Sequence, residues 1–126
     1  MSPRRITTLI ALGRAAIGAT LLAAPQPAGK GWLGDVADDP RAQAVLRGLG
    51  ARDLAIGIGT LVSLTRGRRP DRWIEAGILA DGADAFAALM ARERLAPASL
   101  ATTVAVAGGA ALLGVYTRFA SVDQAE

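Results

Sequence analysis

The chain of 126 residues contains neither cysteine nor histidine, and it has only five aromatic residues. The absence of cysteine excludes disulfides and thiol catalysis, and the absence of histidine excludes a Ser-His-Asp triad. The usual zinc sites and the common forms of haem ligation lose their ligands for the same reason. We therefore expect no metal ion and no cofactor.

What the chain does have is apolar and small. Hydrophobic residues make up 52% of it, with 28 alanines and 15 glycines. Fourteen basic residues oppose eleven acidic ones, for a net charge of +3, and thirteen of the fourteen are arginine. These arginines cluster between apolar blocks rather than along a polar face, which favours a membrane over nucleic acid as the partner.

Four apolar blocks follow one another in the sequence, at about 6–24, 45–64, 73–91 and 97–116. Each is close to the roughly 20 residues that a helix needs to cross a bilayer. None alternates with period 2, and their alanine and leucine content favours helix. The sequence therefore predicts one all-α domain over 1–126, a transmembrane four-helix bundle. Residues 25–41, rich in glycine, proline and aspartate, are expected to form a polar link.

Basic residues in the short links predict the orientation. Seven arginines fall on one side of the four spans, and four basic residues fall on the other. This bias places both termini in the cytoplasm and the protein in the cytoplasmic membrane. The seven are Arg4, Arg5, Arg66, Arg68, Arg69, Arg72 and Arg118, and the four are Lys30, Arg41, Arg92 and Arg94.

Two alternatives compete with this interpretation. The first apolar block, preceded by two arginines, is also typical of a signal peptide, but Arg14 in its middle argues against that. A soluble four-helix bundle is compatible with the modest mean hydropathy of +0.34. The last block argues against a soluble bundle, because its apolar residues cover every face of a helix.

Five charged residues interrupt the apolar blocks at one depth. Counted at 1.5 Å per residue from the cytoplasmic end of each helix, they lie about 12–18 Å deep, near the middle of a bilayer. A lone charge there costs about 2.5–3.5 kcal/mol, so the five are expected to meet inside the bundle. Two arginines and three aspartates leave one negative charge, which a proton, a cation or a cationic ligand would balance. The candidates for this polar layer or ligand site are Arg14, Arg52, Asp53, Asp81 and Asp84.

Small residues recur every four positions along these blocks, a spacing that lets membrane helices approach closely. Those expected to pack helices together are Gly18, Gly57, Gly59, Gly108 and Gly109. The segment Gly57-Ile58-Gly59 is not a nucleotide-binding loop, because it lacks the third glycine and a preceding strand.

Two segments together resemble a known family. They are Gly50-Ala51-Arg52-Asp53-Leu54-Ala55-Ile56-Gly57 and Asp81-Gly82-Ala83-Asp84-Ala85. With these two helices, and with Gly13-Arg14 in the first block, the chain resembles an uncharacterised family of small four-span bacterial membrane proteins, a domain of unknown function. The resemblance covers nearly the whole chain and implies an integral protein of the bacterial cell membrane. It implies no particular reaction.

Three hypotheses for the function follow. In the first, the charged layer fixes the helices of a structural or accessory module, which forms a homo-oligomer or joins a membrane partner subunit through its charge-free last helix. In the second, the layer is a mid-membrane site that binds or transports a lipophilic small molecule, a proton or a cation, and then a cavity should touch it. In the third, an aspartate is an acid–base catalyst on a lipophilic substrate. No nucleophile or cofactor motif supports an enzyme, and a D-x-x-D pair alone binds magnesium poorly.

Overall fold

The part of the chain that the computed structural model describes, residues 1–120, is helical. Its α-helices are α1 (Pro3–Ala23), α2 (Pro25–Leu33), α3 (Pro40–Thr65), α4 (Asp71–Met90) and α5 (Pro97–Ala120), and a short 3-10 helix, η1, occupies Gly34–Asp38. These residues contain no strand, so the predicted all-α class is confirmed.

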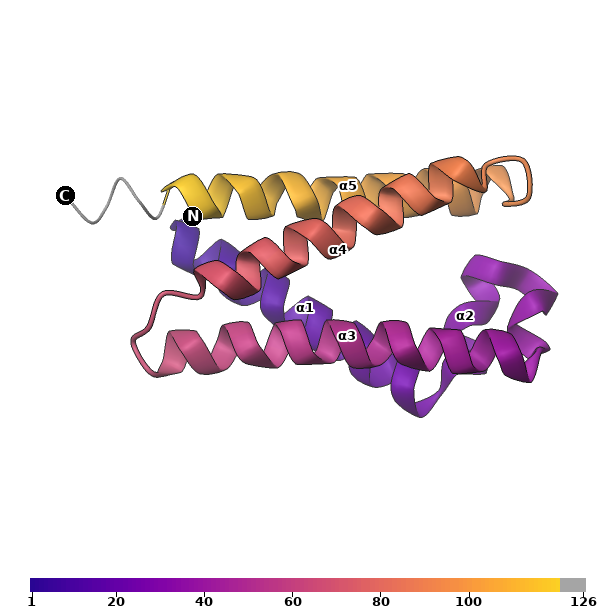
Figure 1. Cartoon of the computed structure of the whole chain (residues 1–126), viewed down its shortest axis with the longest axis horizontal. Helices are drawn as coiled ribbons and strands as arrows, with labels where there is room; N and C mark the ends of the chain where they lie inside the picture. The colour runs from indigo at the N-terminus through magenta and orange to yellow at the C-terminus, as the bar shows by residue number, and fades with distance from the viewer. Residues whose placement is uncertain (121–126) are drawn as a thin grey trace.

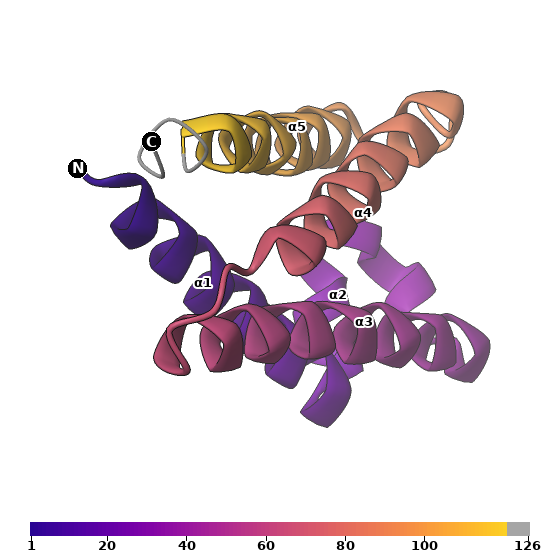
Figure 2. The ribbon, with the colours of Figure 1, turned by 60° about the vertical axis from the view of Figure 1, so that its left-hand side comes forward.

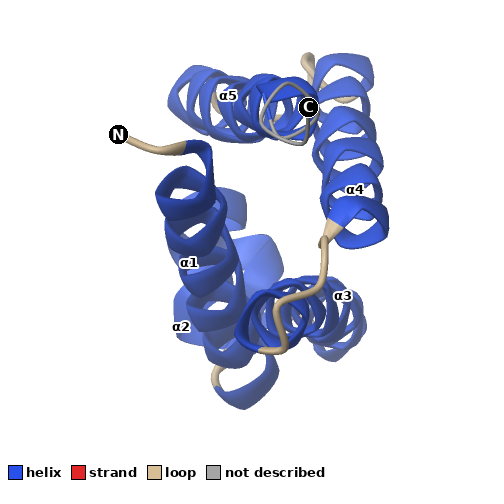
Figure 3. Ribbon diagram, turned by 90° about the vertical axis from the view of Figure 1, so that its left-hand side faces the viewer, coloured by secondary structure: helices blue, strands red, loops and turns tan. Residues whose placement is uncertain are grey.

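The four long helices form two antiparallel pairs, shown in Figure 1. α1 packs along α3, and α4 packs along α5. The N-terminus, the α3–α4 link and the last described turn of α5 lie together at what we call the terminal end, while α2 and the α4–α5 turn lie at the opposite α2 end. Figure 2 shows the two pairs on opposite sides of the molecule, and Figure 3 shows the four helices arranged around its centre.

Local sequence sets where the helices begin. α1, α2, α3 and α5 each begin with a proline, whose fixed φ suits the first turn and whose missing N–H is not needed there. The side chain of Asp39 accepts a hydrogen bond of 2.8 Å from the backbone N–H of Arg41 and so caps α3. Gly34 and Gly67 adopt positive φ angles of 59° and 66° in the links, a conformation that glycine takes without steric cost.

Glycines bring α1 and α3 into backbone contact. A Cβ atom on Gly18 would lie 2.5 Å from the backbone nitrogen of Leu54, and one on Gly57 would lie 2.7 Å from the carbonyl oxygen of Ala11. Gly50, on the same face of α3, is equally close to the backbone of α1. Because backbone atoms cannot move aside as a flexible side chain can, only glycine fits these three positions.

The other glycines that were expected to pack helices behave differently. Gly59 faces the indole ring of Trp73 on α4 rather than another backbone. A Cβ atom on Gly108 or Gly109 would meet nothing within 4 Å among the described residues, so neither glycine brings two helix backbones together as Gly18, Gly50 and Gly57 do. That these two glycines pack helices together therefore stays a prediction.

Two further expectations need correction. Residues 25–41, expected as a polar link, contain α2 and η1, because Pro25 and Pro27 can occupy the first turn of a new helix as well as end the old one. The four predicted spans agree with α1, α3, α4 and α5 to within five residues at each end. However, only α1 and α5, among the described helices, are long and apolar enough to cross a membrane by length and composition. α3 and α4 carry four of the five charges of the polar layer, which lowers their apolarity.

Candidate functional site: an ionic layer between two cavities

Arg14 on α1 joins three helices through its guanidinium group. Its Nη1 atom donates a hydrogen bond of 3.0 Å to Oδ1 of Asp53 on α3, and its Nη2 atom donates to Oδ2 of Asp81 on α4. The side chains are 8%, 16% and 10% exposed respectively, so these ion pairs are largely buried. Burial of this kind is expected of charges only when they are paired.

Arg52 extends the same network along α3 and α4. It binds Asp84 through two hydrogen bonds, of 2.6 and 3.0 Å, and it also donates to Oδ1 of Asp53 at 3.1 Å. The side chains of Arg52 and Asp84 are about one third exposed. All five charged residues that the sequence places at one depth thus form one connected ionic layer, in the order Asp81, Arg14, Asp53, Arg52, Asp84.

This ionic layer has an excess of carboxylate. Its two guanidinium groups face three carboxyl groups, which leaves a net charge of −1 when all five are ionised. Oδ2 of Asp53 and Oδ1 of Asp81 accept no hydrogen bond from the described residues, although neither oxygen is fully buried. Each therefore has room for an additional hydrogen-bond donor or positive charge.

A large cavity opens on the α2 side of the ionic layer. Its volume is about 1050 Å³, and apolar residues of α1, α3, α4 and α5 form most of its wall. Arg14, Asp53, Asp81 and Asp84 supply the charged part of that wall. Trp32 of α2 also lines it, and its buried indole N–H has no acceptor among the described residues. A cavity of this size, mostly apolar with a few convergent polar groups, is typical of a small-molecule site.

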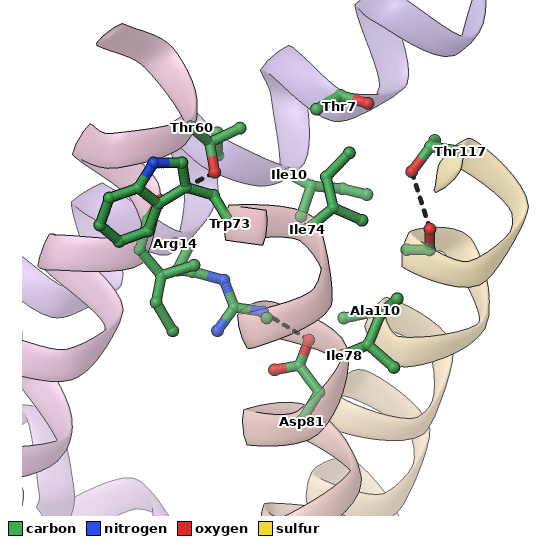
Figure 4. A pocket seen from close by; sticks show the side chains of 14 residues that line it. Thr7, Ile10, Arg14, Thr60, Trp73, Ile74, Ile78, Asp81, Ala110 and Thr117 are labelled. Atoms are coloured by element: carbon green, nitrogen blue, oxygen red, sulfur yellow. Dashed lines mark hydrogen bonds and ion pairs between the residues drawn. The ribbon is translucent and has the colours of Figure 1, made fainter. Parts of the chain in front are cut away.

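A second, much smaller cavity lies on the terminal side of the layer and is shown in Figure 4. Its volume is about 30 Å³. Arg14 and Asp81 form one end of it, and three threonines from three helices lie toward the other end: Thr7, Thr60 and Thr117. All three threonines are buried, with exposures of 7%, 5% and 2%. The Arg14–Asp81 ion pair is thus part of the wall of both cavities.

Sequence reasoning missed Trp32 and the three threonines. A threonine in an apolar helix commonly bonds the carbonyl oxygen one turn earlier, as Thr7 and Thr60 do with Pro3 and Ile56, so it carries little signal by itself. These threonines are distinguished by lining one small cavity together with Arg14. That arrangement depends on how α1, α3 and α5 pack.

The described residues contain no group of three or more acidic side chains placed to hold a metal ion. Guanidinium groups already neutralise most of the carboxylate charge that a divalent cation would need. An excess of one carboxylate suits this ionic layer to recognition of a positive charge or to transfer of a proton.

The structure thus shows a helical protein with a buried ionic layer and two possible membrane spans. Comparisons with protein-family models, with curated proteins and with solved structures find no match to this chain. The resemblance to the four-span bacterial family therefore stays a prediction, and the proposals below depend on the geometry alone.

Proposed function

We propose that this chain is an integral membrane protein that binds a lipophilic organic cation in its large cavity. α1, α3, α4 and α5 would cross the bilayer, with the ionic layer near its middle. The observation that carries the proposal is a mostly apolar cavity of about 1050 Å³ whose wall includes carboxylate oxygens that accept no hydrogen bond from residues 1–120.

The membrane location is supported by where apolar side chains lie. Among residues 1–120, nineteen large apolar residues are exposed, whereas only eight apolar residues are buried, and four of those are alanines. In α5, 6% of the most apolar stretch is buried within the protein, and in α1 the share is 22%. The core helices of a soluble bundle would be mostly buried, and so much exposed apolar surface is rare in soluble monomers. Lipid would cover these faces.

The distribution of basic residues between the two ends of the molecule supports the orientation predicted from the sequence, with the terminal end in the cytoplasm. The terminal end carries the N-terminal arginines and the arginine-rich α3–α4 link, and it holds the larger share of the basic residues. A cytoplasmic location of that end would satisfy the bias of basic residues toward the cytoplasmic side. α1 also contributes Arg14 to the ionic layer, which favours a permanent helix over a cleaved signal peptide.

The charge of the site defines the class of ligand. Three carboxyl groups and the guanidinium group of Arg14 line the large cavity. Arg52 is not part of its wall, but it binds Asp53 and Asp84, which are. In a medium of low dielectric constant, the excess negative charge is costly, and a cation that enters the cavity offsets it. The apolar wall would hold the body of the ligand, and the indole ring of Trp32 would add a cation–π contact.

Binding of tetraphenylphosphonium to the purified protein in detergent tests this proposal. We expect wild-type protein to bind this lipophilic cation, and Asp81→Asn to bind it at least about tenfold more weakly, because a carboxylate of the ionic layer becomes neutral. Asp38→Asn is the matched control, because Asp38 lies at the α2 end outside both cavities and should not affect binding. Failure of wild type to bind, or equal binding by Asp81→Asn, would contradict the proposal.

The structural hypothesis also has an observation in its favour, since Arg14 ties α1, α3 and α4 together. Unfolding of Asp81→Asn in detergent separates the two hypotheses. A purely structural ion pair predicts a loss of several kcal/mol, because Arg14 would lose one of its two partners. A binding site predicts unchanged or higher stability together with lost binding, because functional sites commonly retain destabilising charges.

A further inference from the structure

Asp81 is the aspartate of the ionic layer that both cavities reach. It lines the large cavity and the small one, whereas Asp53 and Asp84 line only the large one. Its side chain is 90% buried, with one oxygen bound to Arg14 and the other without a donor among the described residues. A group in this position can meet a ligand from the α2 side and water from the terminal side.

The small cavity is suited to water. Its volume of about 30 Å³ exceeds the space for one water molecule, roughly 10–15 Å³ on the same measure. The hydroxyl groups of Thr60 and Thr117 donate to carbonyl oxygens of their own helices, at 2.8 and 3.0 Å. Their oxygen lone pairs remain free to accept hydrogen bonds from water, and Arg14 offers donors at the other end of the cavity. Water held between these groups would connect Asp81 toward the terminal end.

We propose that Asp81 exchanges a proton for the organic cation, so that the protein releases one proton through the small cavity for each cation that it binds. This inference rests on the proposed function above. With the large cavity empty, a proton on Asp81 makes the ionic layer neutral. When the cation enters, the O–H bond of the Asp81 carboxyl group breaks, the proton passes to water in the small cavity, and the carboxylate pairs with the cation. The layer is neutral before and after the exchange.

The charged groups that face Asp81 are those of the ionic layer. Arg14 comes from α1, Arg52 and Asp53 from α3, and Asp84 from α4 itself. The residues of α5 that line the two cavities carry no charge. Asp81 and Asp84 lie at the two ends of the layer, and each pairs with one arginine that also binds Asp53. Arg52 donates two hydrogen bonds to Asp84, whereas Arg14 donates one to Asp81, so Asp81 is the less fully bound of the two.

Calorimetric titration of wild-type protein with tetraphenylphosphonium, in buffers that differ in ionisation enthalpy, counts the protons released. We expect about one proton per bound cation near neutral pH and weaker binding at lower pH, because proton and cation compete for one carboxylate. Binding without proton release would overturn this inference and leave the proposed function intact. No binding would overturn both.

The route of the proton is tested by the threonines. We expect the double variant Thr60→Val and Thr117→Val to bind the cation as tightly as wild type, but to release its proton at least about tenfold more slowly, because the water loses hydrogen-bond partners. Stopped-flow mixing with a pH indicator measures this rate. Thr20→Val is the matched control, because its hydroxyl group makes the same kind of bond, 2.8 Å to the carbonyl oxygen of Ala16, but lines neither cavity. An unchanged rate in the double variant, or an equal slowing in the control, would overturn the route.

Discussion

The contact between α1 and α3 gives the sharpest test of the fold. A Cβ atom on Gly57 would lie 2.7 Å from the carbonyl oxygen of Ala11 and 2.8 Å from the backbone nitrogen of Ala15. Both distances fall well inside 3.4 Å, the lower limit of ordinary contact. Both neighbours are backbone atoms of α1, which cannot rotate aside as a side chain can. Gly57→Ala must therefore move α1 away from α3 by about 0.6–0.7 Å at this contact.

The expected loss of stability follows from two opposing terms. Overpacking against a rigid neighbour costs about 1–3 kcal/mol. Alanine is a better helix former than glycine by about 0.5–1 kcal/mol, which offsets part of that cost. We therefore expect Gly57→Ala to lower the free energy of unfolding by about 0–2.5 kcal/mol, and to lie about 1–3 kcal/mol below a glycine-to-alanine change without the close contact.

The matched control is Gly48→Ala in the same helix. A Cβ atom on Gly48 would meet nothing within 4 Å, so only the gain in helix propensity of about 0.5–1 kcal/mol remains. The two variants can be compared by titrating the protein in mild detergent with a denaturing detergent and following the helical circular dichroism signal. If Gly57→Ala unfolds at the same point as Gly48→Ala, the close contact between α1 and α3 does not exist as described.

Two further outcomes follow from the charges. Arg14→Met should destabilise the protein by about 3 kcal/mol, because it removes the shared partner of two buried carboxylates. Arg52→Met should cost about 1 kcal/mol, because the side chain of Arg52 is one third exposed. Equal losses of stability in detergent unfolding would contradict this ranking. At the α2 end, hydrogen bonds of 2.7 Å each from Lys30 and Gln26 lower the pKa of Asp38. The stability that these hydrogen bonds contribute is present above the unfolded pKa of Asp38, about 4, and disappears as the pH falls through the lower folded value. Asp38→Asn should therefore flatten the acid side of a plot of melting temperature against pH, and an unchanged slope would refute this prediction.

The packing of α1 against α3 and the proposed exchange of a proton for a cation are tested by different variants, although Gly57→Ala would also move Arg14 of α1 relative to Asp53 of α3. The glycines lie between α1 and α3, whereas the cavities lie between the α1–α3 pair and the α4–α5 pair. A variant such as Gly57→Ala therefore tests the scaffold, and the aspartate and threonine variants test the site. Loss of binding in a site variant that unfolds like wild type would be an effect on the site itself.

The sequence by itself determined the helical class, the approximate extent of the four long helices and the depth of the charges. These properties are local, because hydrophobic runs and the rise per residue along a helix are independent of neighbouring helices. That the five charged residues would meet also followed from the sequence, since isolated charges at that depth are too costly.

Only the tertiary structure decided how the charges pair and what surrounds them. The rotation of each helix about its axis determines that Arg14 contacts Asp53 and Asp81 while Arg52 contacts Asp84. The same rotation separates Gly18 and Gly57, which touch a neighbouring backbone, from Gly108 and Gly109, which do not, although all four lie within apolar helices. Residues from both helix pairs line the two cavities, and no local pattern of residues encodes how one pair lies relative to the other.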